Sequence, residues 1–192
     1  MEKSSLTNQI KKSAKGLSFS HIGFAKAKTY KEDYDHLNNW VDNGYHAQME
    51  WIKKRILERS NILEYYPKAE SIIIITQNYY TGTVNAEDDI GKISNYAWGN
   101  DYHLVIKKKL YQLLKKIQDY DPSLEGLVCV DTSPIMEKAW AQRAGIGWIG
   151  KHTNLITRDI GSWFFLGSII INKKLEYDNF FEEDLCGTCT AC

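Results

Sequence analysis

The longest regular pattern of apolar positions lies in DYHLVIKKKLYQLLKKIQDY (101–120). Its apolar residues recur every three or four positions and would form one stripe on a helix: Ile106, Leu110, Leu113, Leu114 and Ile117. Asp101 stands where an N-cap belongs. The spacing therefore predicts an amphipathic helix with a lysine-rich outer face, which we interpret as a solvated surface rather than a phosphate-binding one.

Shorter apolar runs predict strands. SIIIITQN (71–78) is apolar at both odd and even positions, which is typical of a central strand covered on both faces. HIGFAKA (21–27), GLVCVD (126–131) and WFFLGSIII (163–171) are further strand candidates, and ISNYAW (93–98) is a weak strand or a loop.

Three further segments have helical character. The stretch 5–16 ends at Gly16, and 33–44 ends at Gly44. In 132–145 we predict Ser133 as N-cap and Pro134 as the first helical residue. Because strands and helices mix irregularly, the pattern predicts one α+β or α/β domain, followed near the C-terminal end by the start of a second element.

Composition narrows the class of protein. The 192 residues include 43% hydrophobic and 25% charged residues, as in an ordinary globular protein. Lys+Arg and Asp+Glu both number 24, so the molecule has no overall basic field for nucleic acid. The run SIIII (71–75) is too short to span a membrane, and the first 16 residues are too polar for a signal peptide. We expect a cytoplasmic protein that does not enter a membrane.

Three of the four cysteines lie in CGTCTAC (186–192), as Cys186, Cys189 and Cys192. A structural zinc site would require a second C-x2-C half or histidines nearby, and a redox C-x-x-C pair has no use for a third thiol. The spacing matches the ferredoxin run C-x2-C-x2-C up to its third cysteine, which favours a [4Fe–4S] cluster over zinc. Cys129 lies in an apolar run and is expected to be a core residue.

The chain ends on that third cysteine, before a fourth ligand. We therefore expect a sequence truncated inside the motif, in which a cluster cannot be completed.

The segment GIGWIG (145–150) matches G-x-G-x-x-G. A dinucleotide-binding loop must follow a strand and open a helix, whereas these glycines follow a predicted helix and precede a predicted strand. We interpret them as a tight turn or a point of close backbone approach.

Four stretches together resemble the epoxyqueuosine reductases. They are ISNYAWGNDYHLVIKKKL (93–110), VDTSPIMEKAWAQRAGIGWIGKHTNLI (130–156), GSWFFLGSII (161–170) and CGTCTAC (186–192). The resemblance covers most of the chain in order and is weaker before residue 60. Its specific part runs from residue 130 to 170.

The resemblance implies a fold and a reaction. The fold would be α+β, with a central mixed or antiparallel sheet flanked by helices, like the corrinoid domains of reductive dehalogenases and of a vitamin B12 processing protein. The reaction would be reduction of epoxyqueuosine to queuosine in a tRNA anticodon, with cobalamin, two [4Fe–4S] clusters and an external electron donor. Residues 1–180 would be the cobalamin-binding domain and 181–192 the start of a ferredoxin-like domain. We expect a monomer, and no turnover from this chain alone.

The resemblance also assigns residues. Asp131 matches the proposed proton donor, which must be protonated near neutral pH and so requires an apolar pocket, formed by the corrin and nearby aromatic residues. A helix N-cap is the alternative role for Asp131. Ser94 stands where some relatives have a cysteine near the cobalt, and since a hydroxyl is a harder ligand than a thiol, we expect contact or a bridging water there.

Arg59 matches an arginine near the corrin, with a surface ion pair to Glu58 or Glu64 as its alternative. Leu155 and Leu166 match segments that line the corrin, and their alternative role is that of plain core residues. An aromatic residue in WGNDYH (98–103) could stack on the substrate or the ring. His103 is not expected to bind cobalt, because the family binds cobalamin without a protein histidine on the metal.

Three other functions remain open at this stage. The chain could belong to another corrinoid-dependent reductase, such as a dehalogenase-like enzyme. It could be a corrinoid carrier without catalysis, which the presence of Asp131 disfavours. A plain iron–sulfur electron carrier would have no use for the preceding domain.

Overall fold

The computed structural model describes residues 3–82 and 91–191. Its centre is a four-stranded sheet in the order β1-β2-β6-β3, in which every neighbouring pair is antiparallel. The strands are β1 (His21–Lys26), β2 (Ser71–Asn78), β3 (Gly126–Cys129) and β6 (Phe164–Ile171). A separate hairpin joins β4 (Trp148–Ile149) to β5 (Leu155–Ile156). The α+β class with an antiparallel sheet flanked by helices is confirmed.

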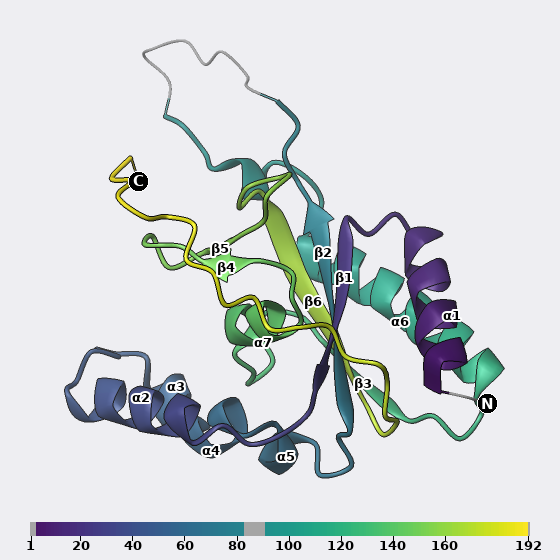
Figure 1. The fold of residues 1–192 in the computed structure, drawn as a ribbon. Coiled ribbons are helices and arrows are strands. Elements are labelled where there is room, and N and C mark those ends of the chain that lie inside the picture. The colour runs from purple at the N-terminus through teal and green to yellow at the C-terminus, as the bar shows by residue number, and fades with distance from the viewer. Residues whose placement is uncertain (1–2, 83–90, 192) are drawn as a thin grey trace.

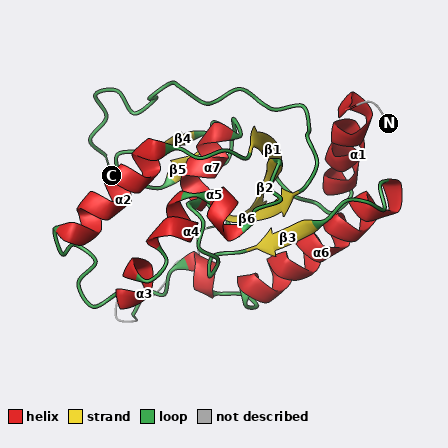
Figure 2. Ribbon diagram, turned by 90° about the horizontal axis from the view of Figure 1, so that it is seen from below, coloured by secondary structure: helices red, strands yellow, loops and turns green. Residues whose placement is uncertain are grey.

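Helices cover both faces of the sheet (Figures 1 and 2). On one face lie α1 (Lys3–Lys15) and α6 (Tyr102–Tyr120). On the other lies α7 (Glu137–Arg143), and beyond it a lobe of short helices. The lobe consists of α2 (Lys31–Asp42), α3 (Glu50–Lys53), α4 (Ile56–Ser60) and α5 (Ile62–Tyr65).

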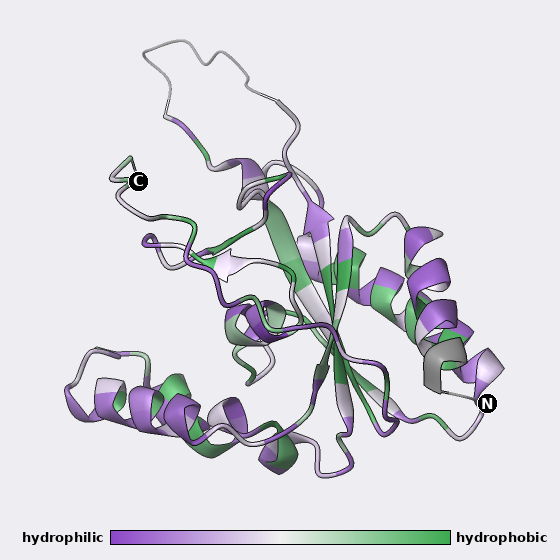
Figure 3. Ribbon diagram, in the orientation of Figure 1, coloured by the Kyte–Doolittle hydropathy of each residue, from purple (hydrophilic) through white to green (hydrophobic). Residues whose placement is uncertain are grey.

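The two-sided apolar character of β2 follows from this arrangement. Ile73 and Ile75 point into the core under α1 and α6, whereas Ile72 and Ile74 point into the core under α7. All four side chains are fully buried. Figure 3 shows apolar residues concentrated along the strands of the sheet and many polar residues on the outer helices.

The long helix predicted at 101–120 is α6, and Asp101 is its N-cap because its side chain accepts the backbone N–H of His103. All five residues of the predicted stripe are buried on this helix. The strands predicted at 21–27, 71–78, 126–131 and 163–171 correspond to β1, β2, β3 and β6. The weak segment 93–98 contains a short 3-10 helix, η1 (Asn95–Ala97).

One predicted helix boundary is wrong. The helix expected at 132–145 begins only at Glu137, so Ser133 is not its N-cap and Pro134 is not its first residue. The intervening residues form turns, with the N–H of Ile135 bonded to the carbonyl of Ser133. Ile135 is 4% exposed, and burying it against the sheet keeps this segment out of the helix.

The segment after β6 is irregular and crosses the sheet next to α7 (Figure 1). Backbone hydrogen bonds attach Asp178 to Phe24 and Phe181 to Gln142. The ring of Phe181 stacks on Trp148, with 5.7 Å between centroids. No helix among the described residues is long and apolar enough to cross a membrane.

Candidate functional site

The register of the sheet brings the candidate residues to one end of it. β3 ends at Cys129 opposite Ser168, and β2 ends at Asn78 opposite Phe164. The chain leaving β3 therefore runs toward the Phe164 end of β6. Asp131 lies there, and the N-terminus of α6 reaches the same place, because His103 contacts Asp131.

His103 lies between two carboxyl groups. Its Nδ1 is 2.8 Å from Oδ1 of Asp101, and its Nε2 is 2.9 Å from Oδ2 of Asp131. With an acceptor at each ring nitrogen, the doubly protonated imidazolium is favoured. Hydrogen bonding to Asp131 is the largest cause of a raised His103 pKa, with Asp101 acting in the same direction against desolvation.

The Asp131 side chain is 56% exposed. The described residues therefore do not enclose it in the apolar pocket that its proton-donor role predicts. That a bound corrin would form part of this pocket stays a prediction. The N-cap alternative does not apply, since Met136 is the N-cap residue of α7.

Glu137 is a carboxyl group that the sequence reasoning missed. Its Oε1 accepts the backbone N–H of Asp131 at 2.9 Å. Desolvation by burial is the largest influence on it and raises its pKa to about 7. The sequence does show a glutamate six residues after Asp131. Because the helix was predicted to begin near residue 133, Glu137 was not recognised as the first residue of α7, next to Asp131.

An open cleft of about 450 Å³ lies near this cluster, because Tyr102 stacks on both His103 and Phe165, and Phe165 lines the cleft. Leu155 and Leu166 both line it, together with Tyr79, Tyr96, Lys138, Asn154, Ser162, Trp163, Phe164 and Phe165. Leu155 also belongs to the core at 3% exposure, whereas Leu166 is only partly buried. The two leucines predicted to lie at one site thus share one cleft.

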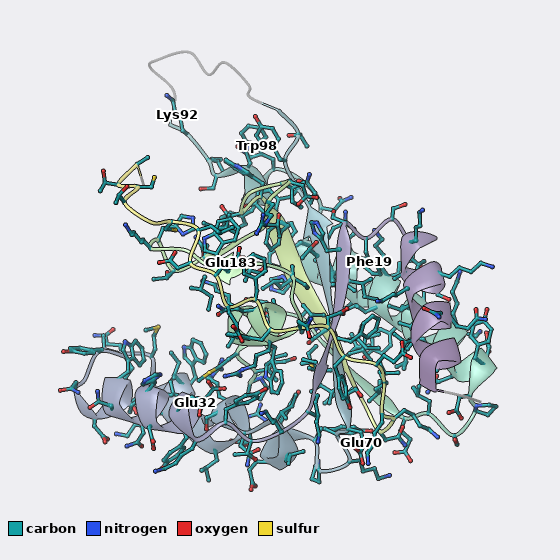
Figure 4. All side chains as sticks on the ribbon, in the orientation of Figure 1. Phe19, Glu32, Glu70, Lys92, Trp98 and Glu183 are labelled. Carbon is teal, nitrogen blue, oxygen red and sulfur yellow. The ribbon has the colours of Figure 1, made fainter. Side chains whose placement is uncertain are left out.

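Large apolar side chains around the cleft are exposed. They are Tyr80 (46%), Ile93 (69%), Tyr96 (54%), Trp98 (45%) and Trp163 (44%). Tyr79 and Tyr80 both contact Trp163, and Tyr102 stacks on Phe165 with 4.0 Å between ring centroids. Figure 4 shows Trp98 on this end of the molecule. Exposed aromatic residues gathered around a cleft are typical of a surface that binds a ligand or a partner.

Arg59 lies on α4 and does not form the ion pair that was its alternative role. The partner of Glu58 is Arg55, at 3.3 Å. The guanidinium of Arg59 lies over the Trp51 ring at 5.2 Å, and its buried Nε has no hydrogen-bond partner within the described part of the chain. Burial is the main cause of its lowered pKa, and it lies near enough to Glu137 for their charges to interact.

Ser94 is exposed and precedes η1, and its carbonyl accepts the N–H of Ala97. It lies two residues before Tyr96, which lines the cleft. The structure shows no contact between Ser94 and Asp131 or Arg59. Its predicted place near cobalt stays a prediction.

The described cysteines of CGTCTAC lie in the irregular C-terminal segment. Cys186 is partly buried and Cys189 exposed, and both are free thiols. Lys151 donates from Nζ to the carbonyls of Gly187 at 2.7 Å and Cys189 at 2.9 Å, which attaches this loop to the β4–β5 hairpin. Cys192 lies outside the described residues, among which no group of three metal-ligating side chains occurs. Cys129 is fully buried, as predicted, and burial raises the pKa of its thiol to about 11.

This antiparallel α+β domain, with an acid–imidazole cluster beside an aromatic cleft, has the fold of reductive dehalogenases. One such structure matches 98% of this chain and 23% of its own length with a TM-score of 0.58 at 13% identity, which shows the fold alone. A family model described as "Epoxyqueuosine reductase QueG, DUF1730" matches residues 59–132. The epoxyqueuosine reductase of Synechocystis sp. is 48% identical over 157 residues, 81% of this chain and 53% of that protein.

Two solved structures agree with that match. A selenomethionine-labelled epoxyqueuosine reductase has a TM-score of 0.88 at 30% identity, over 97% of this chain and 50% of its own. Another, with an epoxyqueuosine-modified tRNA-Tyr stem loop, has a TM-score of 0.88 at 29% identity, over 96% of this chain and 50% of its own. The chain belongs to the epoxyqueuosine reductase family, and it spans about half the length of these relatives.

Proposed function

We propose that this chain carries the cobalamin-binding part of an oxidoreductase that reduces epoxyqueuosine to queuosine in tRNA. Family membership supports the reaction, as does the relative whose structure includes an epoxyqueuosine-modified stem loop. The observation on this chain that carries the proposal is the Asp101–His103–Asp131 cluster at the edge of the aromatic cleft.

The residues present fit a corrin. The cleft and the exposed aromatic residues around it form an apolar surface that a flat, largely apolar ring would cover. Leu155 and Leu166 would contact one part of the ring. The buried Nε of Arg59 has no hydrogen-bond partner among the described residues, which leaves a donor for a polar group. Ser94 would lie near the metal without ligating it. When bound, cobalamin would supply the two electrons to the epoxide.

The thiol spacing of Cys186 and Cys189 fits two ligands of an iron–sulfur cluster, with Cys192 as a third. We infer that residues 181–192 begin a ferredoxin-like element and that 1–180 form the cobalamin-binding domain. Two clusters in the whole protein would receive electrons from an external donor. We propose that the protein acts as a monomer on tRNA in the cytoplasm, and the tRNA-bound relative supports the tRNA part of this proposal.

The reaction requires two protons as well as two electrons. Reduction breaks both carbon–oxygen bonds of the epoxide, leaves a carbon–carbon double bond and releases the oxygen as water. Asp131 would donate a proton to the oxygen that becomes an alkoxide when the ring opens. Because the protonated ring of His103 is favoured in the structure, His103 would first pass a proton through Nε2 to the Asp131 carboxylate, which would then deliver it to the oxygen.

Substitution of Asp131 tests this role. In the enzyme reconstituted with its cofactors, Asp131→Asn is expected to lower turnover of an epoxyqueuosine-modified stem loop by about 100-fold or more, the usual contribution of a general acid. Binding of the stem loop should change little, because the asparagine keeps the size and polarity of the side chain. Turnover within about twofold of the wild type would contradict the proton-donor role.

A further inference from the structure

Asp131 holds a left-handed backbone conformation, which is uncommon for residues other than glycine, although aspartate adopts it more readily than most. Its φ is +49°, in the left-handed region that suits glycine, although it is neither a glycine nor part of a regular element. A non-glycine residue in this region is strained, and it persists there only where the surroundings stabilise it. The site residue is therefore held in place by neighbouring groups.

Two side chains, from helices on opposite faces of the sheet, restrain Asp131 through hydrogen bonds. His103, on α6, binds the Asp131 carboxyl through Nε2. Glu137, on α7, accepts the Asp131 backbone N–H through Oε1. The first contact orients the side chain, and the second fixes the peptide from which the side chain projects.

Glu137 is placed to position Asp131 rather than to exchange protons with its carboxyl. Its hydrogen bond goes to the peptide nitrogen of Asp131. It is the first residue of α7, and the short helix is anchored by Trp140 and Ala141, which are 3% and 0% exposed. An acceptor on an anchored helix gives the loop a fixed point of attachment.

The charged and titratable groups around Glu137 come from several elements. They are Arg59 on α4, Tyr102 and His103 on α6, Cys129 at the end of β3, and Asp131 itself. Desolvation and the charge of Asp131 favour the neutral form of Glu137, whereas the hydrogen bond from the Asp131 backbone N–H and the charges of Arg59 and His103 favour its charged form. Desolvation outweighs the opposing influences, and the pKa of Glu137 is raised to about 7.

We propose that Glu137 is a positioning residue, which holds the Asp131 peptide in its left-handed conformation and so aims the Asp131 carboxyl at the cleft. The effect of Glu137 on turnover rests on the proposed function, whereas its hydrogen bond to the Asp131 N–H does not. A charged carboxylate is a stronger acceptor for the N–H than a neutral carboxyl group. The hold on Asp131 therefore strengthens as Glu137 ionises.

The Asp131 amide proton reports on this contact without any cofactor or substrate. In ¹H–¹⁵N spectra of the 192-residue chain, we expect its shift to move downfield with rising pH, with a midpoint near 7. In Glu137→Gln the amide stays protected from exchange but loses this titration, because the neutral side-chain carbonyl still accepts. In Glu137→Ala its exchange should accelerate by about tenfold or more. The exposed Glu64→Ala is the matched control and should leave the amide unchanged.

An Asp131 amide with no titration in the wild type, or with equal protection in Glu137→Ala, would overturn the proposal. Turnover separates it from the proposed function. In the reconstituted enzyme we expect Glu137→Ala to lower kcat at least about tenfold with little change in KM, and Glu137→Gln to recover most of the loss. If the wild type reduces no epoxyqueuosine while the amide behaves as expected, the proposed function fails and the positioning contact stands. Full turnover in Glu137→Ala would refute the positioning role in catalysis.

Discussion

At the scale of single residues, the site depends on an imidazole between two carboxylates. His103 is 30% exposed and Asp131 56% exposed, so water screens much of their attraction. The pair therefore contributes little to stability, and its main effect is to set the protonation of His103. Proton supply at the site should follow the titration of this ring.

Removing the charge of Asp131 should make that dependence visible. Hydrogen bonding to Asp131 is the largest cause of the raised His103 pKa. In Asp131→Asn we expect the His103 pKa to fall toward its ordinary value of about 6.5. The ring C–H resonances in an NMR titration measure this directly. A His103 pKa equal to that of the wild type would show that Asp101 alone sets it.

The same shift predicts how turnover depends on pH. Because the folded-state pKa of His103 is raised, its charged form is complete below about 6.5 and is lost as pH rises through the raised value. Turnover of the reconstituted enzyme should therefore decline on the alkaline side as His103 loses its proton. In His103→Gln that alkaline limb should disappear and overall turnover should be lower, which a kcat–pH profile would measure. A limb that persists unchanged would assign it to another group.

The family resemblance, rather than residue types alone, singled out part of the candidate site. Asp131, Leu155 and Leu166 were expected from the specific stretch 130–170, and they lie at one end of the sheet. The bond from the Asp131 N–H to Glu137 was not predicted, because a left-handed peptide is not visible in the sequence. The orphaned Nε of Arg59 likewise depends on how α4 packs.

At the scale of elements, the spacing of apolar residues predicted α6, and their distribution over odd and even positions predicted the strands. Both patterns arise from local geometry, in which one face of a helix or both faces of a strand are buried. The start of α7 was misplaced because the turn signals Ser133 and Pro134 are local, whereas burial of Ile135 is a tertiary effect. Helix ends are sensitive to such competition.

The contact between β1 and the end of α7 is close enough to test by adding one methyl group. A Cβ on Gly23 would collide with the backbone carbonyl of Ala144, which follows α7 directly. Gly23→Ala should lower the free energy of unfolding by roughly 1–3 kcal/mol, as overpacking does. Gly99→Ala is the control, since a Cβ there meets nothing within 4 Å. Urea denaturation would measure both variants, and equal midpoints would contradict the packing described.

Packing of α6 on the sheet gives a second test of stability. Leu110, on the face of α6 that packs on the sheet, is fully buried, whereas Leu104 on the first turn of α6 is 69% exposed. Leu110→Ala should cost about 2–5 kcal/mol of unfolding free energy, and Leu104→Ala should cost less than about 0.5. Thermal or urea unfolding of the two variants compares the same substitution at both exposures. Similar losses at the two positions would mean that α6 does not bury the face described.

At the scale of the whole molecule, the antiparallel sheet serves as a platform with its functional groups at one end. Helices on both faces reach that end, α6 with His103 and α7 with Glu137. The C-terminal segment crosses the domain and places the cysteine loop beside Lys151 of the β4–β5 hairpin, whose β5 begins at Leu155 of the cleft. One short stretch of chain thus connects the proposed cluster ligands to the proposed corrin surface.

The central claim is that the aromatic cleft is a corrin surface, and an anaerobic titration of this chain with cob(II)alamin tests it most directly. We expect saturable binding by visible absorption, and a base-off cobalt EPR spectrum without coupling to a histidine nitrogen. Leu166→Trp, which fills part of the cleft, should weaken binding at least about tenfold, and Tyr111→Trp on the outer face of α6 should not. Absence of binding, or binding that Leu166→Trp leaves unchanged, would contradict the assignment of the cleft.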